Sequence, residues 1–123
     1  MADCVLVTGG SRNIGRGICE RLTEDGHKVV QLDVLPPENP DAAEFVKVDL
    51  SDEHATATAL AALNQCHRVT KLVNNVGISF MADLEDTGLV DFDRVMRINT
   101  RVALQYTQAV VPGMKTAGFG RLV

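Results

Sequence analysis

The sequence predicts a three-layer α/β fold, in which helices cover both faces of a doubly wound parallel sheet. Short apolar runs alternate with amphipathic helical segments along the 123 residues, and this alternation is typical of strand–helix–strand units. The runs are apolar at successive positions, as expected of strands that are buried on both faces. Four strands and the start of a fifth are predicted, so we expect an incomplete sheet in one domain spanning residues 1–123.

Each element follows from a local pattern of apolar and turn-forming residues. In chain order we expect a strand at 3–8, a helix from Asn13 to about Asp25, a strand at 28–33, a proline-containing loop at 34–44, a strand at 45–48, a helix to about Gln65, a strand at 70–74, a loop at 75–88, one long helix at 89–115 and a strand that begins at Leu122. Gly26 is the expected C-terminal cap of the first helix, and Ser51 the expected N-cap of the second. The long helix has a wide apolar surface that includes Phe92 and Met96, so we expect burial on two sides.

A glycine-containing loop follows the first predicted strand and opens the first predicted helix. It reads Thr-Gly-Gly-Ser-Arg-Asn-Ile-Gly from Thr8 to Gly15. Glycines let a pyrophosphate approach the backbone, and the helix N-terminus offers N–H groups with about half a positive charge. Ser11 and Arg12 add a hydroxyl and a cation at the same place. The order of strand, glycines and helix therefore predicts a dinucleotide site rather than a plain turn.

Asp33 ends the second predicted strand, where an acid in dinucleotide-binding folds accepts hydrogen bonds from the adenosine ribose. A carboxylate there also repels a 2′-phosphate, which favours NAD over NADP. Arg12 opposes this preference, because an arginine beside the glycine loop can pair with a 2′-phosphate. We give Asp33 more weight, since it lies where that phosphate would be. A solvated acid at a strand end is the alternative interpretation.

Together these motifs resemble those of the short-chain dehydrogenase/reductase family, in its N-terminal half. Thr8-Gly9-x-x-x-Asn13-x-Gly15 is similar to the family's TGxxxGxG cofactor loop, and Asn74-Asn75-Val76-Gly77 is similar to its NNAG motif. Asp49 matches the adenine-contacting aspartate, and Asn99 matches the asparagine of the Asn-Ser-Tyr-Lys catalytic tetrad. The resemblance implies a Rossmann-type fold with strand order 3-2-1-4-5, hydride transfer between NAD(H) and a carbonyl or secondary alcohol, and catalysis at Asn99. The cofactor-binding residues implied are Gly9, Ser11, Arg12, Asn13, Ile14, Gly15, Asp33, Asp49, Leu50, Asn75, Val76 and Gly77.

The chain departs from the family pattern in three places. Asn13 replaces the middle glycine of the loop, and asparagine tolerates the left-handed conformation better than most residues. Val76 replaces the alanine of NNAG. The only tyrosine, Tyr106, is followed four positions later by Val110 and not by lysine, and the family's catalytic Ser and Tyr-x-x-x-Lys have no counterpart in these residues. We therefore expect a domain truncated before the catalytic segment and inactive alone.

Two further interpretations stay open at this stage. A non-catalytic dinucleotide-binding or interaction module would explain the missing serine, tyrosine and lysine. Asn99 has a structural alternative, in which its side chain bonds a neighbouring backbone group. A phosphoacceptor domain is disfavoured, because it needs an acidic pair after the first strand, where Thr8-Gly9-Gly10 stand.

Composition restricts the partners and the compartment. The net charge of −4 disfavours nucleic acid as a partner, and no apolar run reaches the roughly 20 residues of a membrane span. Neither a signal peptide nor a metal-ligand spacing of histidine and cysteine is evident. The three cysteines favour free, buried thiols in a reducing cytoplasm. From the resemblance we expect a homodimer or homotetramer formed through the 89–115 helix.

Overall fold

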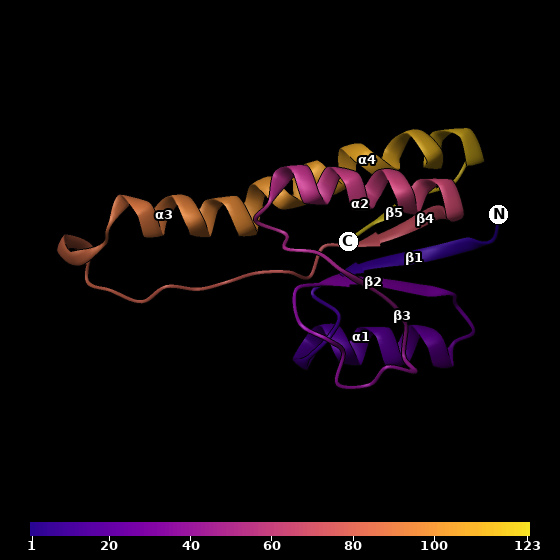
Figure 1. The fold of residues 1–123 in the computed structure, drawn as a ribbon, viewed down its shortest axis with the longest axis horizontal. Coiled ribbons are helices and arrows are strands. Elements are labelled where there is room, and N and C mark those ends of the chain that lie inside the picture. The colour runs from indigo at the N-terminus through magenta and orange to yellow at the C-terminus, as the bar shows by residue number, and fades with distance from the viewer.

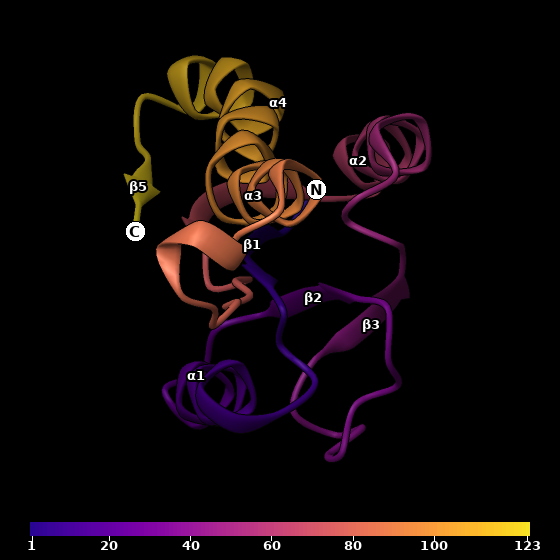
Figure 2. The same ribbon diagram turned by 90° about the vertical axis from the view of Figure 1, so that its left-hand side faces the viewer.

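The computed structural model describes residues 1–123 and contains one five-stranded parallel sheet in the order β3-β2-β1-β4-β5. Helix α1 covers one face of the sheet, and helices α2 and α4 cover the other (Figure 1, Figure 2). The predicted three-layer α/β class and the strand order 3-2-1-4-5 are therefore confirmed. The fifth strand has two residues and pairs with β4, so β4 is partly covered at this edge.

The elements agree with the predicted order, with boundaries that differ by a few residues. They are β1 (Asp3–Thr8), α1 (Asn13–Glu24), β2 (Val29–Asp33), β3 (Glu44–Lys47), α2 (Glu53–Cys66), β4 (Arg68–Val73), the 3₁₀ turn η1 (Leu84–Asp86), α3 (Leu89–Met96), the π-helical segment η2 (Arg97–Arg101), α4 (Val102–Ala117) and β5 (Arg121–Leu122). Strand β4 starts earlier than the predicted 70–74, and η1 lies within the predicted loop at 75–88.

The two faces of the sheet bury two separate apolar clusters. Alternate residues of β1 and β2 point to opposite faces, as the period of a strand requires. On the face of α2 and α4, Leu6, Leu32 and Tyr106 belong to a cluster of 15 buried residues. On the face of α1, Val5 and Cys19 belong to a cluster of five. The two clusters together explain why successive positions of β1 and β2 are apolar.

The caps of the helices match the prediction for α1 and correct it for α2. Gly26 follows the end of α1 with φ of +83°, a left-handed conformation that suits glycine. Ser51 is not the N-cap of α2. The cap is Asp52, whose side chain accepts from the N–H of Ala55, while the Ser51 hydroxyl donates to Asp49.

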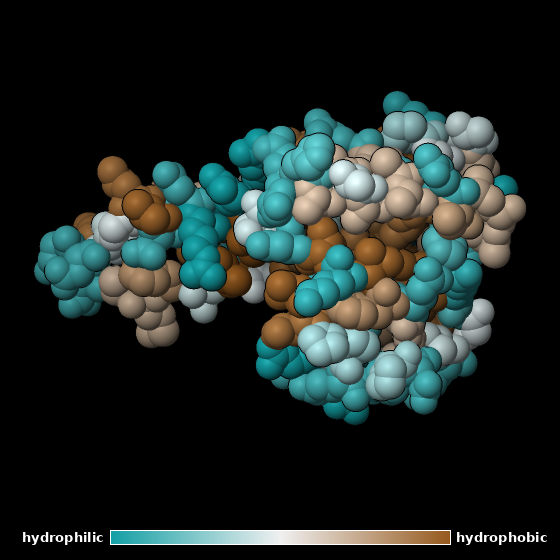
Figure 3. All heavy atoms as spheres, viewed as in Figure 1, coloured by the Kyte–Doolittle hydropathy of each residue, from teal (hydrophilic) through white to brown (hydrophobic).

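The long helix predicted at 89–115 is helical throughout but is not buried throughout. The π-helical segment η2 separates α3 from α4, and only α4 packs on the sheet (Figure 1). Helix α3 forms an arm that extends away from the sheet beyond the carboxyl end of β4, and its residues Leu89 and Val90 are 80% and 81% exposed. The expectation of burial on two sides is therefore wrong for α3, and Phe92 and Met96 are exposed. Figure 3 shows apolar atoms along this arm.

The expectation of three buried thiols holds for Cys4 and Cys19 and is wrong for Cys66. Cys66 is the last residue of α2, where the helix end faces outward. All three cysteines are free. Burial raises the pKa of Cys4 and of Cys19 to about 11, so both thiols are protonated at neutral pH.

Candidate cofactor site at the carboxyl edge of the sheet

The loop after β1 folds back closely on itself, and glycine is required where it does so. Gly9 has φ of +68°, and a Cβ on Gly15 would strike the carbonyl oxygen of Gly9. Asn13 has φ of +51°, so it takes up the left-handed conformation expected of an asparagine at this position. The tight path therefore depends on glycine at positions 9 and 15.

The N-terminus of α1 presents free backbone donors at the end of this loop. Arg12 is the N-cap residue, and no side chain caps the helix. Arg12 and Ile14 are exposed, and the Arg12 side chain has no acidic partner within the chain. The leading N–H groups and the helix dipole together favour an anionic group here.

Ser11 and Asp33 are brought together, but through the backbone of Ser11. The Ser11 N–H donates to Asp33 Oδ2 at 3.2 Å, and the N–H of Leu35 donates to Asp33 Oδ1 at 3.2 Å. The Ser11 hydroxyl is fully buried and donates to the carbonyl oxygen of Leu35 at 2.7 Å. The hydroxyl therefore ties the loop to the segment after β2 and does not face a phosphate, which corrects the role expected from the sequence.

Thr8 fastens the glycine loop to the segment after β4, a role that the sequence analysis missed. Its Oγ1 accepts from the N–H groups of Asn75 at 3.0 Å and Val76 at 3.2 Å, and it donates to the carbonyl oxygen of Val73 at 3.4 Å. The side chain of Asn75 adds a second tie, since its Nδ2 donates to the carbonyl oxygen of Gly9 at 3.0 Å. The one signal in the sequence is a threonine at the end of an otherwise apolar strand.

A cavity of about 190 Å³ lies at the carboxyl edge of the sheet, and Asp33, one of its lining residues, accepts from the Ser11 N–H of the glycine loop. Its apolar lining comes from Leu50, Val76 and Ile98 among others, and the carboxylates of Asp33 and Asp49 lie at the same cavity. The remaining lining residues are Val34, Ser51, Ile78 and Arg94. An apolar floor with carboxylate acceptors at its edge suits a flat heterocycle joined to a ribose.

Ser51 holds the Asp49 carboxylate in its charged form. The Ser51 hydroxyl donates to Asp49 Oδ1 at 2.6 Å, and the Ser51 N–H donates to the same oxygen at 3.0 Å. These bonds lower the pKa of Asp49 below its ordinary value of 3.8. Asp49 is therefore an acceptor and not a proton donor at neutral pH.

Asn99 lies in the π-helical segment and bonds the backbone of Ile78 in both directions. Its Nδ2 donates to the carbonyl oxygen of Ile78 at 2.7 Å, and its Oδ1 accepts from the N–H of Ile78 at 2.8 Å. A Cβ on Gly77 would lie 3.2 Å from Asn99 Oδ1, so glycine gives this contact its room. In this arrangement the Asn99 side chain bonds a backbone group, as in the structural alternative to a catalytic role. The two bonds hold the segment after β4 against η2.

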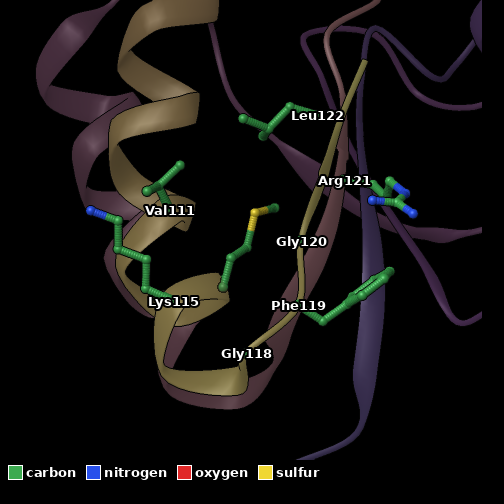
Figure 4. Close-up of a pocket in the computed structure, with 8 residues that line it drawn as sticks. Val111, Lys115, Gly118, Phe119, Gly120, Arg121 and Leu122 are labelled. Carbon is green, nitrogen blue, oxygen red and sulfur yellow. The ribbon is translucent and has the colours of Figure 1, made fainter.

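Other polar and hollow features lie away from this edge. Tyr106 is fully buried on α4, and burial raises its pKa further above the ordinary value of 10. Asn74 Oδ1 is buried without a partner, so the side chain provides no tie through that oxygen, whereas the Asn74 N–H donates to the carbonyl oxygen of Val123. A wider hollow, about 520 Å³, lies between the end of α4 and β5, and none of the predicted site residues lines it (Figure 4).

The chain contains no group of three histidine, cysteine, aspartate or glutamate side chains that could together hold a metal ion. None of its helices combines the length and the apolar character that a membrane crossing requires.

Comparison with known proteins agrees with this geometry. A family profile described as short chain dehydrogenase matches residues 3–123. The chain belongs to this family. This is an oxidoreductase family that uses NAD or NADP.

Several relatives are more than 30% identical to this chain. It is 33% identical over 129 residues to a 3-alpha-(or 20-beta)-hydroxysteroid dehydrogenase of Mycobacterium tuberculosis, covering 96% of this chain and 48% of the relative. It is 36% identical over 121 residues to human L-xylulose reductase, and the match covers 93% of this chain and 48% of the reductase. It is 35% identical over 121 residues to the 3-oxoacyl-[acyl-carrier-protein] reductase MabA of Mycobacterium tuberculosis, covering 97% and 48%. The chain thus spans about half the length of these relatives.

Solved structures share the fold at similar coverage. A short chain dehydrogenase from Leptospira borgpetersenii with bound NAD+ superimposes with a TM-score of 0.88 at 25% identity, covering 99% of this chain and 50% of that one. A short-chain dehydrogenase from Streptomyces avermitilis gives a TM-score of 0.86 at 27% identity, covering 99% and 48%.

Proposed function

We propose that residues 1–123 are the nucleotide-binding half of an NAD-dependent oxidoreductase that moves a hydride between NAD(H) and a carbonyl or secondary alcohol. One observation carries this proposal. The N-terminus of α1, which no side chain caps, follows the glycine loop, and the Ser11 N–H of that loop donates to Asp33, which lines a cavity together with Asp49. Anion donors, carboxylate acceptors and an apolar floor are what a dinucleotide requires in one place.

The preference for NAD over NADP depends on Asp33. Its oxygens each accept one backbone N–H and keep further acceptor capacity for the hydroxyls of a ribose. A 2′-phosphate placed at the same carboxylate would be repelled. Arg12 is exposed and free of acidic partners, so it is the residue that would reduce the preference.

The chemical step needs groups beyond those in these residues. Bound NAD+ supplies the hydride acceptor. Of the tetrad that the family resemblance implies, only Asn99 is present here, and both ends of its amide bond Ile78. An amide does not protonate a carbonyl oxygen, so we assign the acid–base step to the full-length protein and propose that the 123-residue chain is inactive alone.

The substrate class is proposed at the level that the relatives have in common. Their names include a hydroxysteroid, cyclopentanol, L-xylulose and a 3-oxoacyl-[acyl-carrier-protein]. What unites them is a hydroxyl or carbonyl carbon. We therefore propose a small carbonyl or alcohol, with 3-oxoacyl reduction as one candidate, and a reducing cytoplasm as the compartment, supported by three free cysteines.

Titration calorimetry of the full-length protein with NAD and with NADP tests the cofactor assignment, and NADH absorbance with a panel of ketones and alcohols tests the reaction. We expect tighter binding of NAD and turnover of at least one compound. Binding without turnover of any compound would support the non-catalytic dinucleotide-binding module instead. Absence of binding to either dinucleotide would refute both.

We also propose that the 89–115 region pairs with a second copy in a homodimer or homotetramer. The arm exposes Leu89, Val90 and Phe92, and its charges are segregated, with Asp91 near its start and Arg97 near its end. An antiparallel pair would therefore bring opposite charges together around an apolar strip. Sedimentation of the full-length protein tests this proposal, since a monomer at all concentrations would refute it.

A further inference from the structure

The side chain of Gln31 is buried with both of its polar atoms unpaired. Gln31 lies on β2 and is only 1% exposed, and neither Nε2 nor Oε1 has a hydrogen-bond partner. Cys19, an apolar neighbour on the α1 face, packs beside it. Burial of an unpaired amide is unfavourable, so an apolar residue of similar length would suit this position better unless the glutamine has a further role.

Gln31 contacts the inner surface of the cofactor loop at Gly10. A Cβ on Gly10 would overlap Gln31 Oε1, and it would lie 2.8 Å from Gln31 Cβ and from Cys19 Sγ. Gly10 has no positive φ, so its backbone conformation is open to any residue. The close approach of Gln31 and Cys19 is therefore the reason for glycine at this position.

The loop residues on either side of Gly10 are tied to the strand residues that follow Gln31. The Gly9 N–H donates to the carbonyl oxygen of Leu32 at 2.8 Å, and the Ser11 N–H donates to Asp33 Oδ2 at 3.2 Å. Gln31 therefore supports the middle of a stretch whose two ends are held by hydrogen bonds. The distance between the loop and β2 therefore depends on the side chains that fill the space between Gly10 and β2.

We infer that Gln31 is a positioning residue for the cofactor loop, because its side chain fills the space beneath Gly10 and fixes the spacing between the loop and β2. The inference rests on the proposed function, since it takes the task of the loop to be dinucleotide binding. Gln31 touches no cofactor atom and acts through Gly9, Gly10 and Ser11. Gly10 and Gln31 therefore form a coupled pair, in which a larger residue at one position requires a smaller residue at the other.

A double-mutant cycle in the full-length protein tests this coupling. Gly10→Ala should raise the Kd for NAD at least about tenfold in the wild-type background and less than about threefold in the Gln31→Ala background. The rescue is partial, because Gln31→Ala removes Oε1 but retains the Cβ of residue 31, and this Cβ and Cys19 Sγ both remain 2.8 Å from the added methyl group. Amide hydrogen exchange at residues 9–12 without NAD is the second measurement, and Gln31→Ala alone should accelerate it.

Gly17→Ala is the matched control, because a Cβ at this exposed position of α1 has nothing within 4 Å. Its Kd should equal that of the wild type within about twofold. The inference is overturned when Gly10→Ala is equally harmful in both backgrounds, or when exchange at residues 9–12 is unchanged by Gln31→Ala. A wild-type protein that binds no NAD refutes the proposed function, while the exchange measurement still decides the role of Gln31.

Discussion

Replacing Asp33 separates two roles that the structure assigns to one carboxylate. Its oxygens accept the N–H groups of Ser11 and Leu35, both at 3.2 Å, and the proposed function adds the ribose hydroxyls of NAD. Asp33→Ala removes the loop contacts and the ribose acceptor together. Asp33→Asn removes the charge and one of the two acceptor oxygens, so it keeps one of the two loop contacts and one acceptor. Comparison of the two variants therefore distinguishes loop architecture from charge-based selection of the cofactor.

The magnitude follows from the strength of a charged acceptor. A hydrogen bond to a charged group contributes about 1.5–3 kcal/mol, and about 1.4 kcal/mol changes Kd tenfold. Asp33 is half-buried, and its contacts to Ser11 and Leu35 are long, so we expect the lower end of this range. Asp33→Ala should weaken NAD binding about tenfold. Asp33→Asn should weaken it less and should bring the Kd values for NAD and NADP closer together, since the repulsion of the 2′-phosphate is lost.

Titration calorimetry of the full-length variants with NAD and NADP measures both effects. Glu24→Gln is a suitable control, because it removes one negative charge at the far end of α1 without touching the loop. A ratio of the NADP to the NAD dissociation constant that stays at the wild-type value in both Asp33 variants would show that the cofactor assignment is wrong. A ratio that changes in Asp33→Ala alone would show that Asp33 acts through the loop and not through its charge.

Three further predictions address stability and thiol exposure. Thr8→Val should lower the free energy of unfolding in urea by about 1 kcal/mol or more, because two partly buried N–H groups lose their acceptor. Thr8→Ser should lower it much less, and equal losses in the two variants would show that the hydroxyl does not provide this stability. In a thiol-reagent assay Cys66 should react fast in the native protein and the other two cysteines only after unfolding; three fast thiols would contradict this. Folding lowers the pKa of Asp49 below 3.8. Ser51→Ala should therefore lower the free energy of unfolding at pH 7, and this difference from the wild type should disappear as the solution is acidified through the pKa of the folded state. A difference that does not depend on pH would refute this prediction.

The sheet could be predicted from the sequence because its signals are local. Strands buried on both faces are apolar at most positions, and the ends of β1 and β2 are marked by Gly9 and Asp33. The helical arm could not be predicted in the same way. Phe92 and Val102 belong to one apolar pattern in the sequence, but only Val102 meets the sheet. Periodicity shows which residues share a face of a helix and does not show how far the neighbouring layer extends.

The site was predicted as a set of positions, whereas its hydrogen bonds depend on contacts between distant segments. Thr8 and Asn75 are tied across strands that lie far apart in the sequence, so no local pattern identifies the pair. The same holds for Gln31, which in the sequence is one polar residue within an apolar strand. Its burial beneath Gly10 becomes visible only when β2 and the cofactor loop are placed together.

Several side chains of the candidate site form hydrogen bonds to backbone groups and so fix the position of the loops. The hydroxyl of Ser11 bonds the carbonyl oxygen of Leu35, and the amides of Asn75 and Asn99 bond the backbone of Gly9 and Ile78. The groups left to face an anionic ligand are the backbone of the glycine loop, the first turn of α1 and the exposed side chain of Arg12. Substituting one of these side chains therefore perturbs binding through loop position, and only variants that preserve the loop contact reveal a direct interaction with the cofactor. Asp33→Asn keeps only one of the two loop contacts, so its comparison with Asp33→Ala, rather than either variant alone, tests the proposed preference for NAD.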